Sequence, residues 1–239
     1  MLGASWTNKQ MWARIVVIRK PRDSRMSMPG LREDEKPFPW QIHLRECRDT
    51  VDMVAGCFGT GVVVDRAGSI VTAYHNVTDV DDTPFDWVWV CRYDAQTLDW
   101  TAAFPVKVEA RRCEPDLDIA ILEDERLGIA RPAPLATSWK IDDPVSVIGF
   151  ERDVNRASGC CLHVVRGRIQ APVPTRPPMA IGNLMDGANP TGLSGGPVIN
   201  HRLWSAPAIA VQQLAVPGQQ DAIFQLRAMP VSWFRTLFD

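Results

Sequence analysis

A chain of 239 residues, 46% of them hydrophobic, is long enough for one substantial core or for two smaller cores that share an interface. Its formal net charge of −2 leaves no excess of Lys and Arg to neutralise phosphates, so we expect no nucleic-acid partner. The apolar stretches run only a few residues, whereas a membrane-spanning helix needs roughly 18 to 20. The apolar stretch 15–18 is also too brief for a secretory signal, so we expect a cytoplasmic chain that starts where this sequence starts.

The cysteines predict neither disulfides nor a metal site. They form no CxxC pair, and without export we expect reduced thiols. Cys160, Cys161 and His163 lie close together, but adjacent cysteines are awkward for tetrahedral zinc and no second ligand pair follows. We therefore expect packing roles for them, with no metal and no cofactor. The six cysteines are Cys47, Cys57, Cys91, Cys113, Cys160 and Cys161.

Short apolar stretches rich in Val and Ile predict β-strands along most of the chain. Gly, Pro and Asp separate them, and 19 prolines oppose a mostly helical architecture. The pattern predicts an all-β barrel or sandwich. The expected strands include 13–18, 61–64, 69–73, 87–91, 106–110, 119–122 and 145–150.

Two segments interrupt this strand pattern. Residues 20–39 are charged and contain proline, which predicts a long loop or a partly disordered insertion. The proline-rich stretch 131–134 predicts a connector between an N-terminal and a C-terminal barrel.

At the C-terminus, residues 231–238 predict a short closing helix whose apolar side chains share one face. Those side chains are Trp233, Phe234, Leu237 and Phe238. Core or barrel-interface packing accounts for most of the nine tryptophans. Trp87 and Trp89 alternate along one strand face, however, which leaves an exposed aromatic docking surface as an alternative.

The stretch Gly192-Leu193-Ser194-Gly195-Gly196-Pro197 places one serine among three glycines. An attacking serine needs its hydroxyl beside a carbonyl, with backbone amides aimed at the oxygen that becomes negative. Glycines permit the close approaches that this arrangement requires. We expect the amides of Gly192 and Ser194 to form the oxyanion hole. Taken alone, the string is equally compatible with an ordinary glycine-rich loop.

A histidine and an aspartate each stand beside an apolar stretch. His75 follows the expected strand 69–73, and its imidazole titrates in the range that suits a general base. Asp118 leads into 119–122, where a carboxylate can accept a hydrogen bond from the histidine. Singly, a satisfied strand-end histidine and a solvated turn aspartate are the commoner interpretations. Together, in the order His, Asp, Ser, they predict a catalytic triad.

On these motifs, the sequence resembles the trypsin-like serine peptidases, particularly the bacterial HtrA (Deg) branch. In that family, a strand that contains glycines comes shortly before the histidine. Here the stretch 59–65 comes before the histidine segment 72–77 in the same way. Asp118-Ile119-Ala120-Ile121-Leu122 is similar to the strand that carries the family's acid, which favours Asp118 over Asp116. The resemblance runs from about residue 57 to the end.

The resemblance implies two six-stranded antiparallel β-barrels and a short C-terminal helix in one peptidase domain. Residues 1–130 would form the first barrel, with a loop insertion at about 20–56, and residues 135–239 the second. It also implies a serine endopeptidase that forms an acyl-enzyme on protein or peptide substrates. Its catalytic residues would be His75, Asp118 and Ser194.

The residue before the nucleophile departs from the family pattern. Animal members have Asp there and bacterial relatives usually Asn, whereas this chain has Leu193. Activation by a newly cut N-terminus is therefore not expected. Leu193 suggests the hypothesis that the oxyanion loop rests in an inactive arrangement until a partner protein binds. The chain has no room for the PDZ domain of many HtrA proteins, so we expect no regulation by that module.

In trypsin-like folds, the residue six positions before the nucleophile lies at the base of the S1 pocket, and here it is Ala188. An alanine does not favour Lys or Arg at P1, so we expect a small or medium apolar P1 residue. Gln212, Gln213 and Leu214 would line the pocket further, and the two glutamines could instead bond a polar side chain.

Two other functions remain open at this point. One is a catalytically silent peptide-binding or scaffold module, which only Leu193 favours. The other keeps the protease but makes it an effector in a bacterial signalling or defence system.

Overall fold

The computed structural model describes strands and turns over most of the chain. The predicted insertion at about 20–56 lies outside the described residues. Within them, none of the helices has the length and apolar character that crossing a membrane requires. The described residues are 15–19, 58–79, 81–94, 99–128, 132–152, 160–172, 178–185, 192–215 and 224–238.

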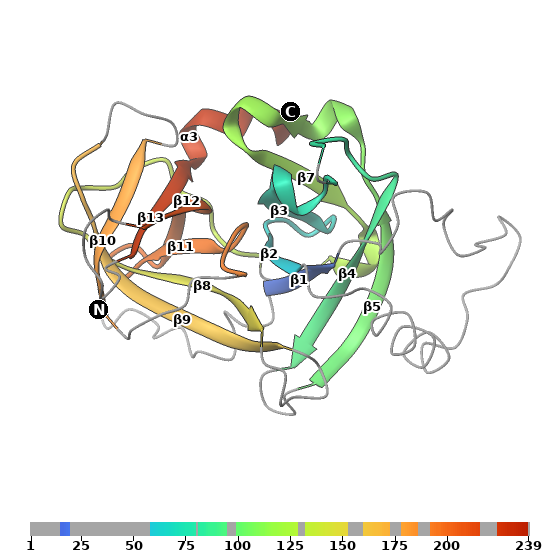
Figure 1. Ribbon diagram of the computed structural model, residues 1–239, viewed down its shortest axis with the longest axis horizontal. Helices are drawn as coiled ribbons and strands as arrows, with labels where there is room; N and C mark the ends of the chain where they lie inside the picture. Colours follow the sequence, from blue (N-terminus) through green and yellow to red (C-terminus); the bar gives the residue numbers. More distant parts are fainter. Residues whose placement is uncertain are drawn as a thin grey trace, which may run out of the picture.

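The N-terminal half forms one antiparallel seven-stranded sheet in the order β5-β4-β1-β2-β3-β7-β6. It occupies the blue-to-green side of the molecule (Figure 1). Short 3-10 turns η1 (Tyr74–Asn76), η2 (Ala110–Arg112), η3 (Pro115–Leu117) and η4 (Glu125–Leu127) interrupt it. Its strands are β1 (Ile15–Arg19), β2 (Phe58–Val63), β3 (Ser69–Ala73), β4 (Trp87–Asp94), β5 (Asp99–Lys107), β6 (Cys113–Glu114) and β7 (Ile119–Glu123).

The C-terminal half is a closed six-stranded barrel in the order β10-β13-β12-β11-β8-β9, on the yellow-to-red side of Figure 1. Apolar side chains from all six strands fill its interior. The helical end consists of α3 (Val231–Phe234) and the 3-10 turn η5 (Arg235–Phe238). The barrel strands are β8 (Pro144–Arg152), β9 (Cys160–Ile169), β10 (Met179–Met185), β11 (Pro197–Asn200), β12 (Ser205–Ala215) and β13 (Phe224–Pro230).

This architecture confirms the all-β, two-barrel prediction. The N-terminal layer has a seventh strand because the two-residue β6 pairs with β7. The strand expected at 106–110 begins earlier and ends at Lys107, where its register partner Trp87 begins β4. One further backbone bond follows, from Val108 N to Asp86 O at 3.0 Å, and the chain then turns at η2.

Trp87 and Trp89 lie between the two halves and form no docking surface. They are 2% and 5% exposed, and they pack against Ile148 and Phe150 of β8. Their rings meet edge to face, with centroids 5.4 Å apart and an interplanar angle of 87°. The two side chains do share one face of β4, and residues of the second barrel cover that face. The exposed-surface alternative is therefore wrong.

The closing helix is confirmed, although its buried face differs from the expected one. Val231 and Phe234 are 1% and 0% exposed, whereas Trp233 is 44% exposed. Residues three apart share a helix face, and Trp233 is rotated about 100° from Phe234. The face that packs on the barrel therefore begins at Val231, which the sequence pattern had omitted.

The connector predicted at 131–134 crosses between the two halves in its described part. Ala133 N donates to Val63 O of β2 at 3.0 Å. The carbonyl of Pro134 accepts from Ala206 N of β12 at 2.8 Å. The segment thus pairs with both halves, and the exact domain bounds stay a prediction.

Candidate active site

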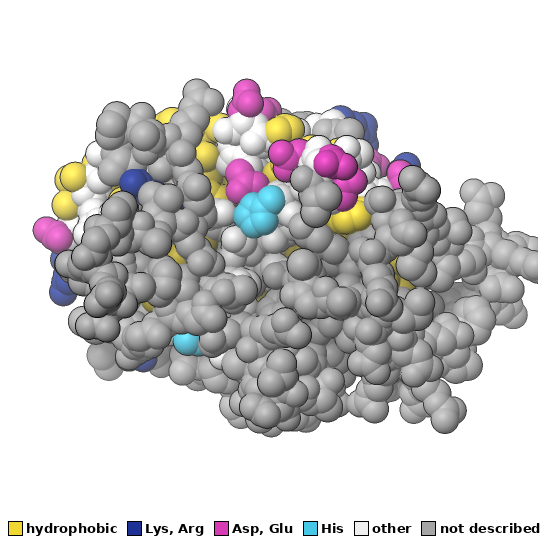
Figure 2. Space-filling view, viewed as in Figure 1, with side chains coloured by type: hydrophobic (Ala, Val, Ile, Leu, Met, Phe, Trp, Pro, Cys, Tyr) yellow, Lys and Arg dark blue, Asp and Glu magenta, His cyan; other side chains and the backbone are white. Residues whose placement is uncertain are grey.

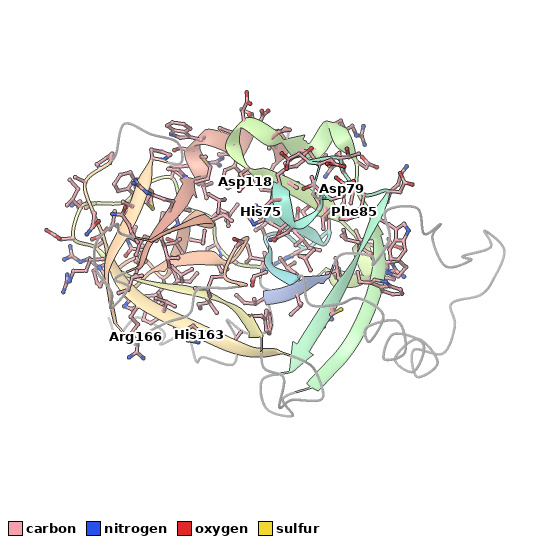
Figure 3. The ribbon with its side chains drawn as sticks, in the orientation of Figure 1. His75, Asp79, Phe85, Asp118, His163 and Arg166 are labelled. Atoms are coloured by element: carbon pink, nitrogen blue, oxygen red, sulfur yellow. The ribbon has the colours of Figure 1, made fainter. Side chains whose placement is uncertain are left out.

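His75 and Asp118 meet at the end of two paired strands. Ala73 at the end of β3 pairs with Ile119 at the start of β7, so the residues just beyond them are neighbours. The Nδ1 atom of His75 lies 2.8 Å from Oδ2 and 3.1 Å from Oδ1 of Asp118. His75 N also donates to Asp118 Oδ1 at 3.0 Å. Figure 3 shows His75 and Asp118 together where β3 ends and β7 begins.

The backbone of Asp118 turns its carboxylate towards the histidine. Its φ of 53° lies in the left-handed region, which Asp tolerates better than most residues. Asp118 N donates to Pro115 O, and Asp118 O accepts from Tyr74 N, each at 3.0 Å. Asp116 is exposed, and the side-chain hydrogen bonds described for His75 go to Asp118. The turn after η3 therefore presents Asp118 to the ring.

The histidine remains open to solvent on its other side. The side chain of His75 is 42% exposed and that of Asp118 is 32% exposed. Figure 2 shows a histidine at the surface, with acidic side chains close to it, where Figure 3 labels His75. An exposed imidazole beside a bound carboxylate can exchange a proton with a group that approaches from solvent.

Ser194 lies in the turn before β11, between two glycines with positive φ. Gly192 has φ 94° and Gly195 has φ 84°. A side chain at Gly195 would lie 1.9 Å from Thr60 O, so glycine is required there. The Ser194 hydroxyl donates a long bond of 3.5 Å to Val211 O. Within the described residues, no hydrogen bond joins it to His75.

The two backbone amides expected to bind an oxyanion belong to Gly192 and Ser194. In the part of the chain that the structure describes, the amides of Gly192 and Ser194 donate no hydrogen bond. Gly196 N donates to Leu193 O at 2.9 Å, which closes the turn on its far side. Within the described residues, these two amides of the serine turn are therefore donors without a protein acceptor.

A family model for the trypsin-like peptidase domain matches residues 59–209. The chain belongs to the trypsin-like peptidase family. Among solved structures, the chain is similar to the Rv3671c protease in a crystal structure of its inactive form, with a TM-score of 0.56. The two are 17% identical over 95% of this chain and 89% of that chain, a likeness that shows the fold alone. No curated protein matches the chain.

In this peptidase domain, Thr60 of β2 holds the serine turn from the other half of the molecule. Thr60 N donates to Ser194 O at 2.8 Å, and Thr60 Oγ1 donates to Gly192 O at 2.7 Å. The same Oγ1 accepts from Phe150 N at 3.0 Å. Because Thr60 is fully buried, these bonds are shielded from water.

Asn76, the residue after the histidine, makes a second link to the same turn. Its Nδ2 donates to Ser194 O at 2.9 Å and to Thr72 Oγ1 at 3.0 Å. A side chain at Gly59 would lie 2.1 Å from the Asn76 amide, so that glycine leaves the room the amide occupies. Sequence reasoning missed Thr60 and Asn76. The sequence signal for both was position: Thr60 lies between Gly59 and Gly61, and Asn76 directly follows the histidine.

Leu193 anchors the turn to the interior of the peptidase's second barrel. It is 1% exposed and packs with the apolar residues that fill that barrel. A side chain at Gly149 would lie 2.9 Å from Leu193 Cα, so β8 approaches the turn closely. An apolar residue before the nucleophile therefore has a packing role. The hypothesis of an inactive resting loop stays a prediction.

The residues expected to line S1 are only partly described. Ala188 lies outside the described residues. Gln212, Gln213 and Leu214 lie in β12, where they pair with β13, and their side chains are not among those described. As to metals, the described residues include no group of three or more potential ligands. The apolar P1 preference stays a prediction.

Proposed function

We propose that this domain is a serine endopeptidase with His75, Asp118 and Ser194 as its catalytic triad. The observation that carries the proposal is the contact of the Asp118 carboxylate with both the ring and the backbone amide of His75. Such a contact holds the proton on Nδ1 and leaves Nε2 as the base. Membership of the trypsin-like peptidase family supports the same assignment.

In the proposed reaction, Ser194 Oγ attacks the substrate carbonyl while His75 Nε2 takes its proton. The amides of Gly192 and Ser194 stabilise the oxyanion, and Asp118 stabilises the imidazolium. His75 then gives the proton to the leaving amine, and an acyl-enzyme remains on Ser194. Water, activated by the same imidazole, hydrolyses this ester and restores the serine.

The serine hydroxyl must first turn away from Val211 O towards His75. The bond that it leaves is long, at 3.5 Å, and is therefore weak. Catalytic hydrogen bonds are often long in the free enzyme and tighten when substrate binds. We infer that substrate binding brings the hydroxyl to the base.

The second candidate, a catalytically silent peptide-binding module, is favoured by one observation. The hydrogen bond described for the Ser194 hydroxyl goes to Val211 O and not to His75. A fluorophosphonate probe, which acylates only an activated serine, distinguishes the two functions. We expect labelling of the wild type and none of Ser194→Ala or His75→Ala, with kcat on peptides lowered by about 10⁴- to 10⁶-fold.

Two matched variants control for general damage. Ser232→Ala removes an exposed serine in α3, and His201→Ala removes a histidine bonded to Ser146. Both are expected to label as the wild type does. A wild type that fails to label, or that labels equally in Ser194→Ala, would leave the silent module as the better assignment.

The biological role, partners and location of the domain are predicted from the sequence alone. These predictions are an activating partner protein, a role as an effector in a bacterial signalling or defence system, and a cytoplasmic location.

A further inference from the structure

Asn76, which directly follows the proposed base, donates both hydrogens of its side-chain amide to protein acceptors. Its Nδ2 atom lies 2.9 Å from Ser194 O and 3.0 Å from Thr72 Oγ1. The residue is 4% exposed, so water competes little for these bonds. A carbonyl oxygen only accepts, so the bond to Ser194 O requires Nδ2, and not Oδ1, to face the serine turn. The amide therefore has a single orientation.

Thr72 and Thr60 close a ring of hydrogen bonds with Asn76 and Ser194. The Thr72 hydroxyl accepts from Asn76 and donates to Thr60 O at 2.7 Å. Thr60 N donates to Ser194 O at 2.8 Å, and this is the carbonyl that also accepts from Asn76. Both threonines are 0% exposed. Buried hydrogen bonds polarise one another, so the loss of one member weakens the rest of the ring.

The ring joins the backbone of the base to the backbone of the nucleophile. On one side of His75, Tyr74 N donates to Asp118 O at 3.0 Å. On the other side, Asn76 donates to Ser194 O. His75 thus lies between a residue bonded to the acid and a residue bonded to the nucleophile. One covalent neighbour and one hydrogen bond separate the two reacting residues.

We propose that Asn76 is a positioning residue, which sets the distance between His75 and the backbone of Ser194. The serine hydroxyl can then turn from Val211 O to the base by rotation of one side chain, while the turn itself stays in place. Leu193 packs in the barrel and has no polar group with which to share this task. The inference rests on the proposed endopeptidase function.

Asn76→Asp tests the direction of the bond. The side chain keeps its shape, but an oxygen that accepts replaces the donor that faces Ser194 O, so the two repel. A displacement of about 1 Å between reacting groups costs about 100-fold, and we expect kcat at pH 8 to fall by about that factor. KM should change less than about twofold, because Asn76 acts on the catalytic step rather than on substrate binding.

Thr72→Val and Thr72→Ser separate hydrogen bonding from packing. Val has the shape of Thr but can neither accept from Asn76 nor donate to Thr60 O, so we expect kcat to fall by about tenfold. Ser keeps the hydroxyl and loses a methyl group, and it should retain kcat within about threefold of the wild type. A role in packing alone predicts the opposite order of the two variants.

Asn200→Ala is the matched control. Asn200 is a fully buried asparagine at the end of β11, and its Nδ2 donates to Asp143 Oδ2 at 2.7 Å. Its loss should lower the midpoint of urea unfolding but leave kcat per active site unchanged, with sites counted by fluorophosphonate titration. Equal losses of kcat in Asn200→Ala and Asn76→Asp, or a Thr72→Val more active than Thr72→Ser, would overturn the inference and leave the endopeptidase assignment intact.

Amide hydrogen exchange, measured by NMR, follows the serine turn without turnover. Gly195 N and Gly196 N are bonded to Ala210 O and Leu193 O, so their exchange reports the opening of the turn. We expect both amides to exchange about tenfold faster in Asn76→Asp than in the wild type, and at the wild-type rate in Asn200→Ala. This result supports the positioning role even if the wild type fails to label. Unchanged exchange in Asn76→Asp would overturn it.

Discussion

The two parts of the candidate site are held in different ways. The base and the acid come from one sheet, where the pairing of Ala73 with Ile119 brings His75 and Asp118 together. The nucleophile belongs to the other half, and its turn is held by Thr60 and Asn76 from across the interface. The first part depends on local strand register. The second depends on how the two halves pack.

Substitutions in the two parts should therefore have different effects on activity and stability. Changes in the first part should remove proton transfer and leave the fold unchanged, because the carboxylate is partly exposed. Changes in the second part should weaken the fold and the activity together, because Thr60 and Asn76 are buried.

The largest effect should come from changing the acid. Asp118→Asn keeps the size of the side chain but removes the charge that fixes the histidine's tautomer. We expect kcat to fall by about 10⁴-fold, with little change in the free energy of unfolding. The matched variant Asp116→Asn changes an exposed residue two positions earlier. It should shift neither the free energy of unfolding nor the activation free energy by more than about 0.5 kcal/mol. A comparable loss of kcat in both variants would contradict the role of Asp118.

A smaller effect is expected from cutting the bond across the interface. Thr60→Val leaves Gly192 O and Phe150 N without the partner that Thr60 Oγ1 provides. We expect the free energy of unfolding to fall by about 2 kcal/mol and kcat/KM by about tenfold. Urea unfolding and peptide kinetics measure the two.

Thr78→Val is the matched control for this comparison. Thr78 is 1% exposed, and its Oγ1 has no hydrogen-bond partner among the described residues. Replacing this hydroxyl with a methyl group should therefore leave the free energy of unfolding unchanged or raise it. If both threonine variants lose the same stability, the link across the interface is not what holds the serine turn.

The smallest effect concerns the edge of the sheet that carries the acid. Cys113 of β6 is a free thiol, and burial raises its pKa from 9.0 to about 11. Because the folded state favours the neutral thiol, this contribution is complete below pH 9 and is lost as the pH rises towards 11. The stability difference between wild type and Cys113→Ala should therefore shrink over that interval, as measured by chemical unfolding. A difference that does not change with pH would show that the thiol titrates alike in both states.

Much of the fold can be predicted from the sequence because strand patterns are local. The stretch 69–73 coincides with β3, and the apolar residues after Asp118 form β7. The motifs predict that His75 and Asp118 meet, and the pairing of Ala73 in β3 with Ile119 in β7 brings them together. The family, too, can be recognised from these motifs alone.

The remaining features depend on tertiary packing. Whether the Trp87 and Trp89 face was exposed or buried depended on the second barrel, which covers it. The bond from Thr60 to Gly192 joins residues 132 positions apart, beyond the reach of any local pattern. The β-bulge at Val211 inserts one extra residue into β12 at the point where its carbonyl contacts the Ser194 hydroxyl, and no local pattern indicates it. The sequence alone determined where most strands form and which reactive groups the chain carries, because these depend on neighbouring residues. Tertiary structure decided burial and partners, because these depend on which surfaces meet.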